Sequence, residues 1–477
     1  MTQQDDTQFE RRDELSRITR EVAQGKISRR AFSRRALALG LSAPAIAAAL
    51  ASVTRIGTFA QNATPAAGEE VDLANLSPDI PEPSSPVKVT FQSWIDTTGE
   101  NFQSMLKQFH ELHPNIKIDP VSVSIDEASQ KLTTQIAGGT APDSVYVDAG
   151  TVADFASRNA LVNVDDYIAK SKAIDVNDYV EAFKVAAVFE DHMYGLPIDG
   201  ETTGLFYRTD LFKAAGIEKP PTTWDEFKAD AEKLTQPDKH QYGFVLFAPE
   251  AAYYYYSWLW QAGGDLLSAD GKQVLFNNDV GKRAAEFYIG LKKYAPPDYL
   301  NSNSWDGRVA FANGQVAMYV AGAWLAGTLQ DEFPDANGKW ATAPLPIDKK
   351  CATQTAGDVL VLPSSAKNQD AAWKWIEFLS APQNMLLWNL GTKEHPTTLL
   401  PPRKSLLDDP RLFENNPVMK GFAEQMTCGV ANTIANPDWP AIETALNESL
   451  GKAIYGDETA SDALDEAAAE ADDILKK

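Results

Sequence analysis

The sequence predicts an α/β protein whose sheets are mainly parallel. After residue 86, segments that alternate apolar and polar residues, as strands do, take turns with segments whose apolar residues recur at helical spacing. Strands separated by helices are typical of parallel sheets that helices cover. The 477 residues are enough for large buried cores and suggest about two to three domains.

The first elements of this body have clear patterns. Residues 87–91 alternate with period two, and residues 100–112 carry apolar side chains at helical spacing up to Pro114, which marks the end of that helix. The expected order is strand 87–91, helix 100–112, strand 116–123, helix 130–137 and strand 144–147. In such sheets, ligand crevices lie beyond the carboxyl ends of the strands.

The N-terminus has the pattern of an export signal. Residues 28–32 (SRRAF) look like a twin-arginine motif, and an Ala-rich apolar run follows over residues 36–53. That run is too short and too rich in Ala for a membrane span, and small residues at 58 and 60 suit cleavage after Ala60. We therefore predict that residues 1–60 are a twin-arginine signal peptide and that the protein works outside the cytoplasmic membrane, in the periplasm or on the outer face. Whether the signal is cleaved stays open.

Composition separates a short linker from an acidic body. Residues 61–86 are rich in Pro, Ala, Ser and acidic residues, so we expect a disordered linker there. The first 60 residues carry a net charge of +4 and the remainder carries −27. A body this acidic repels nucleic acid and anionic membranes, so neither is expected as a partner.

Catalytic and metal-binding motifs are missing. The two histidines of residues 110–113 (HELH) stand three apart, where a zinc-protease helix needs four. There is no Gly-x-Ser-x-Gly, Walker or Gly-x-Gly-x-x-Gly motif. We therefore expect no metal and no cofactor. Carboxylates such as Asp199 and Glu201 leave a secreted glycosidase open, since sequence does not fix their separation.

The sequence has two cysteines, Cys351 and Cys428. They can pair only if the fold brings their α-carbons within about 7 Å of each other. The sequence leaves open both a disulfide and two free thiols.

Residues 195–227 (GLPIDGETTGLFYRTDLFKAAGIEKPPTTWDEF) are the most informative segment for function. They resemble the segment by which extracytoplasmic solute-binding proteins of ABC importers cross from their first lobe to their second. Blocks similar to the same family, in matching order, are 136–148, 258–278, 311–318, 321–324, 355–360 and 371–380. The resemblance runs from about residue 87 to the C-terminus and is closest to the carbohydrate-binding branch, with maltose- and glycerol-phosphate-binding proteins.

The resemblance implies a two-lobed periplasmic-binding-protein-like fold of type II, in which each lobe is a mainly parallel sheet flanked by helices. Lobe one is expected at 87–198 and 345–400. Lobe two is expected at 199–344 and 401–477. Hinge crossings are expected near 198–200, 344–346 and 400–402.

The resemblance implies a binding protein rather than an enzyme. It implies a monomer that captures a sugar or sugar derivative between the lobes and delivers it to an ABC transporter permease. The first alternative is a phosphate ester such as a glycerol-phosphate compound, with Arg403 as the partner of the anion. The others are the glycosidase and a structural surface protein that binds no small solute.

Aromatic side chains are the first candidates for contact with a sugar. The chain has 11 Trp, 15 Tyr and 21 Phe, and aromatic planes cover the apolar C–H face of a sugar ring. In the run of residues 253–260, we expect Tyr253 and Trp258 to face the ligand, although adjacent helical residues point in different directions. Trp324 follows a strand-like segment, and the resemblance implies that it stacks on the sugar.

The remaining candidates lie at predicted strand ends and crossings, where side chains can reach a cleft. Trp94 and Asp148 end strands, and Glu201 matches a family position that accepts hydrogen bonds from ligand hydroxyls. The full set of expected ligand-binding residues is Trp94, Asp96, Thr98, Asp148, Asp199, Glu201, Tyr253, Trp258, Trp324, Gly357, Asp358 and Arg403.

Overall fold

The structure is a computed structural model that describes residues 70–268, 271–297, 307–392, 397–431, 436 and 438–476. All of these belong to one compact unit, Pro65–Lys477. The predicted signal peptide, residues 1–60, lies outside the described residues. In the part of the chain that is described, no helix is both long enough and apolar enough to cross a membrane.

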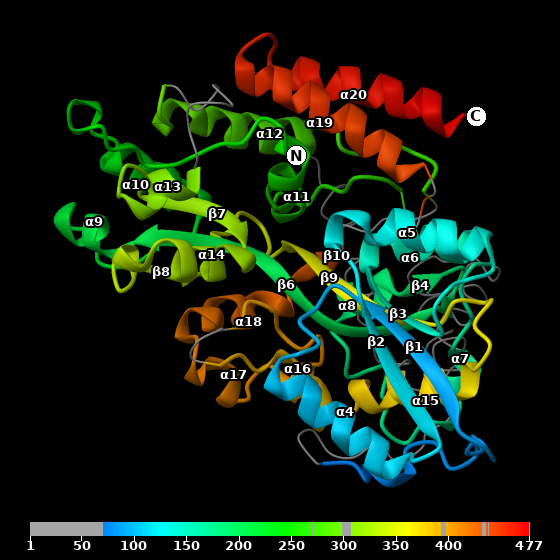
Figure 1. Cartoon of the computed structure of the whole chain (residues 1–477). Coiled ribbons are helices and arrows are strands. Elements are labelled where there is room, and N and C mark those ends of the chain that lie inside the picture. Colours follow the sequence, from blue (N-terminus) through cyan, green and yellow to red (C-terminus); the bar gives the residue numbers. More distant parts are fainter. Residues whose placement is uncertain are drawn as a thin grey trace, which may run out of the picture. The chain divides into compact units, whose positions relative to one another are not determined.

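A mixed sheet of eight strands is the framework (Figure 1), with the order β2-β1-β3-β9-β6-β7, β10 beside β9 and β8 beside β6. β1 runs parallel to β2 and β3, while β9 runs antiparallel to β3 and β6. The strands are β1 (Val87–Ser93), β2 (Ile116–Ser122), β3 (Ser144–Asp148), β6 (Gly195–Arg208), β7 (Met318–Gly322), β8 (Trp340–Ala343), β9 (Thr353–Val361) and β10 (Gly429–Ala431). A separate hairpin joins β4 (Val188–Phe189) to β5 (His192–Met193).

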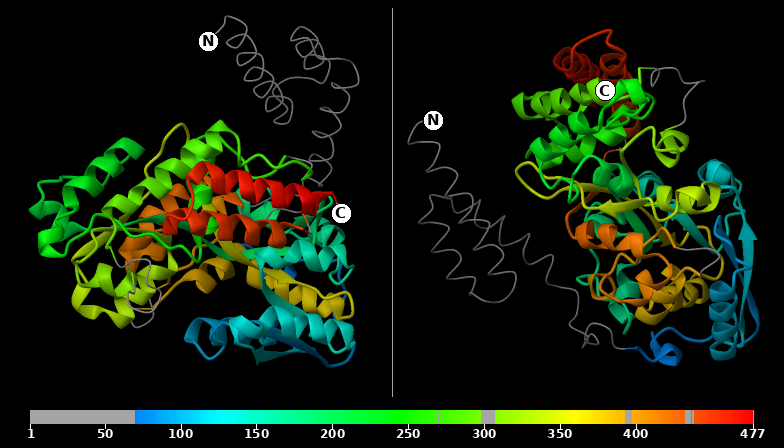
Figure 2. Two further views of the ribbon diagram at one scale, coloured as in Figure 1. Left: turned by 90° about the horizontal axis from the view of Figure 1, so that it is seen from above. Right: turned by 90° about the vertical axis from the view of Figure 1, so that its left-hand side faces the viewer.

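Two hydrophobic clusters pack on this framework. The first surrounds β1 to β3 with helices that include α4 (Glu100–Leu112), α6 (Val152–Ser157), α8 (Glu181–Ala186), α15 (Gln369–Ser380) and α16 (Pro382–Asn389). The second is built mainly from α10 (Trp224–Leu234), α11 (Ala251–Gln261), α12 (Asp279–Gly290), α19 (Trp439–Tyr455) and α20 (Ala460–Leu475). Figure 2 shows α19 and α20 side by side over this second cluster.

Seven further helices complete the described part of the chain. They are α5 (Ile125–Ala137), α7 (Asp165–Lys170), α9 (Thr209–Ala214), α13 (Gly307–Ala312), α14 (Trp324–Glu332), α17 (Arg411–Glu414) and α18 (Lys420–Met426). The predicted helix 100–112 is confirmed as α4. The helix predicted at 130–137 begins earlier, at Ile125. The apolar pattern is weak in its first turn, because Ile125 is exposed and the small Ala128 is the buried residue there.

Strand β6 joins the two clusters. Its first half pairs with β9, and its second half pairs with β7 and β8. Successive strand residues point to opposite faces, so Leu205 enters the second cluster while Phe206 enters the first. The register shifts between Pro197 and Asp199, close to the first predicted crossing.

The predicted disorder of residues 61–86 is wrong for residues 70–86, which pack on the body. Leu76 and Ile80 are buried, and the Ser77 hydroxyl donates to Glu377 Oε1 at 2.7 Å. The Gln383 amide donates to the Val71 carbonyl at 2.7 Å. Composition averaged over the segment hid the two apolar anchors, and the polar anchors come from distant helices that a local pattern cannot show.

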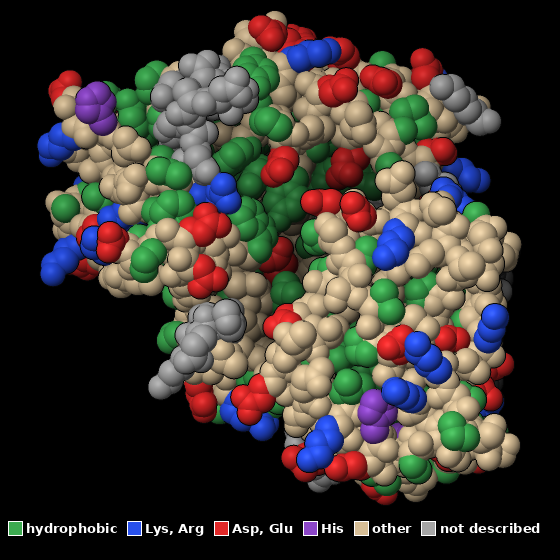
Figure 3. All heavy atoms as spheres, viewed as in Figure 1, with side chains coloured by type: hydrophobic (Ala, Val, Ile, Leu, Met, Phe, Trp, Pro, Cys, Tyr) green, Lys and Arg blue, Asp and Glu red, His purple; other side chains and the backbone are tan. Residues whose placement is uncertain are grey.

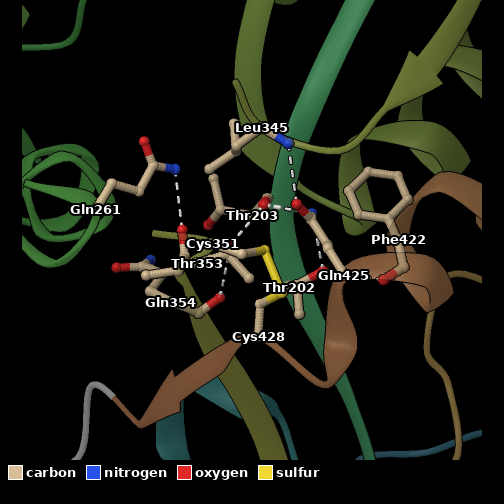
Figure 4. The surroundings of a disulfide bond; sticks show 11 residues. Thr202, Thr203, Gln261, Leu345, Cys351, Thr353, Gln354, Phe422, Gln425 and Cys428 are labelled. Carbon is tan, nitrogen blue, oxygen red and sulfur yellow. Dashed lines mark hydrogen bonds between the residues drawn. A yellow bond between two sulfur atoms is a disulfide. The ribbon is translucent and has the colours of Figure 1, made fainter. Parts of the chain in front are cut away.

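Cys351 and Cys428 form a disulfide, with their α-carbons 5.6 Å apart (Figure 4). It joins the segment before β9 to the segment before β10. Beside it, the Gln425 amide donates to the Thr203 carbonyl at 2.7 Å and accepts from the Leu345 backbone N–H at 2.9 Å. Chain segments far apart in sequence are therefore fastened together where β6, β9 and β10 meet.

Candidate binding cleft

A cavity of about 250 Å³ lies between the two clusters. One wall comes from the end of β3, α6 and α8, the other from the start of α19, and the backbone of β9 lies between them. Its lining residues are Asp148, Ala149, Gly150, Ala153, Asp154, Phe183, Ala186, Thr355, Ala356, Gly357, Asn436, Trp439, Pro440 and Glu443. Figure 3 shows the hollow, with acidic and hydrophobic side chains on its walls.

Three carboxylates form a row across the sheet beside this cavity. Asp148 of β3 is paired in register with Asp358 of β9, which is paired in turn with Asp199 of β6. Like charges that face each other across strands are destabilising. The Tyr146 hydroxyl moderates this, since it lies 2.6 Å from Asp358 Oδ2 and 2.9 Å from Asp199 Oδ2. The Trp388 indole N–H also donates to Asp199 Oδ2, at 2.7 Å.

Burial shifts the pKa values of this row upward. It raises the pKa of Asp199 to about 6, against the opposing effect of the hydrogen bonds that its carboxylate accepts. It raises the pKa of Asp358 well above the usual range, and the neighbouring charge of Asp199 raises it further. The pKa of Asp148 is raised by burial as well, against a hydrogen bond from the Gly150 backbone. The row therefore retains protons more readily than carboxylates in water do.

Glu201 continues the acidic surface along β6. It lies two residues after Asp199, on the same face of the strand. Its Oε2 accepts a hydrogen bond of 2.9 Å from the backbone N–H of Trp324, the first residue of α14. Burial raises the pKa of Glu201 to about 7, while the backbone N–H groups of Trp324 and Ala323 oppose that rise.

Glycine at position 322 permits this arrangement. A β-carbon there would lie 2.6 Å from Trp324 Cδ1 and 2.7 Å from Glu201 Oε1. Both distances are shorter than the non-bonded contacts that β-carbons make, so glycine at this position lets the indole and the carboxylate converge above the end of β7.

Aromatic side chains complete the candidate surface. Trp324 is 39% exposed, although large apolar side chains are normally buried. Tyr253 is half-buried, with its hydroxyl 3.4 Å from Thr203 Oγ1, and its pKa is raised by burial and by the charge of Glu201. The half-buried Trp94 ring lies 4.6 Å from the Tyr146 ring, between centroids. Trp324 thus contacts Glu201 directly, Trp94 contacts Tyr146, which bonds the carboxylate row, and Tyr253 contacts Thr203.

Trp258 does not face the cleft, which corrects the sequence-based expectation. It is fully buried in the second cluster, with ring centroids 5.2 Å from Phe287 and 5.6 Å from Trp224. Of the α11 residues, it is one that turns toward α10 and α12, because a helix presents neighbouring residues in different directions.

Arg403 is also corrected. Its side chain is 2% exposed, donates to the Ala173 carbonyl at 2.8 Å and lies over the Tyr179 ring at 5.2 Å. Asp178 is 3.8 Å away. The guanidinium holds a loop of the first cluster together, so the predicted contact with an anionic ligand has no basis here.

For Asp96, Thr98 and Gly357, the structure neither contradicts nor confirms the predicted contact with a ligand. Asp96 Oδ1 accepts hydrogen bonds from the backbone and the hydroxyl of Thr98 in an exposed turn beyond β1. Gly357 lines the cavity through its backbone, since a β-carbon would lie 2.6 Å from the Asp199 carbonyl oxygen. Their contact with a ligand stays a prediction, as does that of the other residues near the cleft.

Sequence reasoning missed Tyr146, Trp388, Trp439 and Glu443. Tyr146 had a signal, because it stands two residues before Asp148 and shares its face of the strand. Trp388 and Trp439 had none, since α16 and α19 bring them to the cleft from distant parts of the chain.

Comparison with known proteins decides the family. The family of bacterial extracellular solute-binding proteins matches residues 92–386. The chain belongs to this family. This solute-binding protein is 28% identical over 406 residues to a putative binding protein of Brucella abortus, which covers 82% of the chain and 93% of that relative. The mannitol-binding protein of Pseudomonas aeruginosa is 29% identical over 305 residues, which is 57% of this chain and 63% of that protein.

Solved structures agree with the fold. The sugar-binding protein MalE of Xanthomonas citri is 26% identical, with a TM-score of 0.73 over 82% of this chain and 98% of that one. A solute-binding protein of Thermotoga lettingae bound with α-D-tagatose is 26% identical, with a TM-score of 0.67 over 82% of this chain and 100% of that one. The two-lobed fold predicted from sequence is confirmed. This solute-binding protein is thus an extracytoplasmic binding protein, and its relatives are named as binding proteins rather than enzymes.

Proposed function

We propose that the protein captures a sugar or sugar derivative in the cleft and delivers it to the permease of an ABC transporter. The observation that carries the proposal is the half-exposed Trp324 ring beside the Glu201 carboxylate of β6, the strand that joins the two clusters. These two residues do not line the cavity themselves; Asp148 does, and its pairing with Asp358 connects the cavity to the carboxylate row. A sugar presents an apolar C–H face to an aromatic ring and hydroxyl groups to carboxylates. Both kinds of partner are available here.

Relatives support a carbohydrate ligand. The relatives include proteins named as mannitol-binding, lactose-binding and maltotriose-binding. Solved structures at 26% identity include the tagatose-bound protein and an acarbose-bound receptor of Streptomyces glaucescens.

A phosphate ester is no longer supported, because its expected partner, Arg403, is buried away from the cleft. None of the described residues that line the cavity is Lys, Arg or His.

The remaining parts of the proposal concern export and movement. From residues 28–32 we infer export by the twin-arginine route. We also infer that the protein is a monomer whose lobe one comprises residues 87–198 and 345–400. Closure of the lobes about the strands that cross between them would bury the ligand, and the permease would recognise the closed form. The ligand drives closure only as far as it binds that form more tightly.

A thermal-shift screen of the purified protein against monosaccharides, oligosaccharides and polyols tests the function. A ligand at 100 times its dissociation constant should stabilise the fold by about 2.7 kcal/mol. We expect a saturable shift from at least one sugar, with that sugar recovered unchanged. A sugar that is consumed would indicate an enzyme, and a complete absence of shifts would contradict the carbohydrate assignment.

A further inference from the structure

Four carboxylates of the candidate site lack a positively charged partner. Among the described residues, no Lys, Arg or His forms an ion pair with Asp148, Asp199, Glu201 or Asp358. Asp154, on the cavity wall, is different, because Arg158 lies 2.6 Å from it. Asp199 and Glu201 are buried, Asp358 is half-buried and Asp148 is exposed. A buried carboxylate is ordinarily paired with a cation, since desolvation penalises an unpaired charge, so the missing partner matters most for Asp199 and Glu201.

A bound metal ion does not suit this arrangement. No three His, Cys, Asp or Glu residues in the described part of the chain gather closely enough to hold one. The carboxylates are instead spread over three strands, and neighbouring strands are about 4.8 Å apart. A cation that meets them should therefore be part of a larger molecule whose other groups reach along the row.

The surroundings of Glu201 suit an ammonium group. The Trp324 indole converges with the Glu201 carboxylate above Gly322, and 39% of the Trp324 side chain is exposed. An ammonium is attracted both to a carboxylate and to the face of an indole.

Asp199 leaves an acceptor in the same region. Its side chain is 1% exposed, and Oδ2 accepts from Trp388 while Oδ1 has no partner of normal hydrogen-bond geometry among the described residues. Asp358, its partner in register on β9, is acidic as well.

We propose that the ligand is an amino sugar, whose protonated amine binds at Glu201 and Trp324 while its hydroxyl groups extend toward Asp199 and Asp358. This inference rests on the proposed function and narrows it from sugars in general to sugars that carry a positive charge. The amine would supply a positive partner that the described part of the chain does not provide for these carboxylates.

Calorimetry with matched sets of sugars tests the charge directly. Each set contains a neutral sugar, its 2-amino-2-deoxy counterpart and the N-acetylated derivative: glucose with glucosamine, galactose with galactosamine, and the β-1,4-linked oligomers of the first set. We expect at least one amino form to bind ten or more times more tightly than its neutral and acetylated partners. Equal or tighter binding of the neutral form would overturn the inference and leave the sugar function standing. No binding by any form would overturn both.

Two variants test whether the preference for the amino form of the sugar arises at Glu201. Glu201→Gln keeps the shape of the side chain and removes its charge, so the preference for the amino form should fall toward unity. Glu470→Gln removes one acidic charge from an exposed position on α20 and should leave the preference unchanged. An equal loss in both variants would show that the general charge of the body, rather than the site, attracts the amine and would overturn the proposal.

Discussion

Trp258 and Trp324 have the same side chain and opposite surroundings. Trp258 lies within α11, where ten of eleven residues are buried, and aromatic rings enclose it. Trp324 begins α14 directly after β7 and keeps 39% of its surface exposed beside a carboxylate. An aromatic ring at the end of a strand can reach a cleft, whereas one inside a buried helix serves the core. The two rings should therefore separate stability from binding.

The largest expected effect is on the stability of the second cluster. Trp258→Ala should lower the free energy of unfolding by about 3–5 kcal/mol, because it removes a fully buried ring and leaves a cavity. Chemical denaturation measures the loss, and calorimetry on the folded fraction should show unchanged ligand affinity. Trp258→Phe, which keeps an aromatic ring, should lose less. A specific loss of affinity with normal stability would place Trp258 in the site after all.

The pH dependence of stability should come from the carboxylates of the cleft rather than from the second cluster. The pKa of Glu201 is about 7 in the folded protein and 4.5 ordinarily, so folding favours its protonated form. The resulting stability is fully present below pH 4.5 and is lost as the pH rises through 7. The loss is on the order of 3 kcal/mol for this group.

Thermal unfolding from pH 5 to pH 8 measures this slope. Glu201→Gln cannot titrate and should flatten the curve. An unchanged slope in that variant would assign the pH dependence to other groups, such as Asp199, whose raised pKa acts in the same direction.

The effect expected next is on affinity. Trp324→Ala should weaken binding of the sugar found in the screen by about 2 kcal/mol, as the loss of an aromatic anchor does. Its stability should change less than that of Trp258→Ala, because the ring is already partly in water. Calorimetry measures the loss of affinity, and Trp324→Phe is the control variant that keeps part of the contact. Unchanged affinity would remove Trp324 from the site.

The smallest effect is expected beyond β1. Asp96→Ala removes the acceptor of two hydrogen bonds from Thr98 in an exposed turn, which should cost about 1 kcal/mol of stability or less. The same variant tests the predicted ligand contact of this turn by calorimetry. A loss of affinity that exceeds the loss of stability would show that the turn reaches the ligand.

Local patterns predicted the elements well and the site in part. The spacing of apolar residues predicted α4 with its bounds, because one face of this helix packs on the core. Asp148 was predicted because it ends a strand, and Asp199 and Glu201 because they lie at the first crossing, where Glu201 matches a family position. The sheet brings these three into one row or onto one face, while their contact with a ligand stays a prediction.

What could not be predicted depends on pairing between distant segments. The register that sets Asp148 opposite Asp358, and the approach of Trp388 to Asp199, arise only when β3, β9, β6 and α16 assemble. The predictions that Trp258 and Arg403 contact the ligand were wrong for the same reason, since residue type does not reveal which neighbours enclose a side chain.

The bond between Cys351 and Cys428 has a consequence for the order of events in biogenesis. The cytoplasm keeps thiols reduced, and disulfides persist in the oxidising environment outside it. If the chain leaves the cytoplasm already folded, as the proposed twin-arginine route requires, it would cross the membrane as a dithiol, with Gln425 holding the neighbouring segments together. Oxidation would then follow export, so this route would require a fold that forms without the bond.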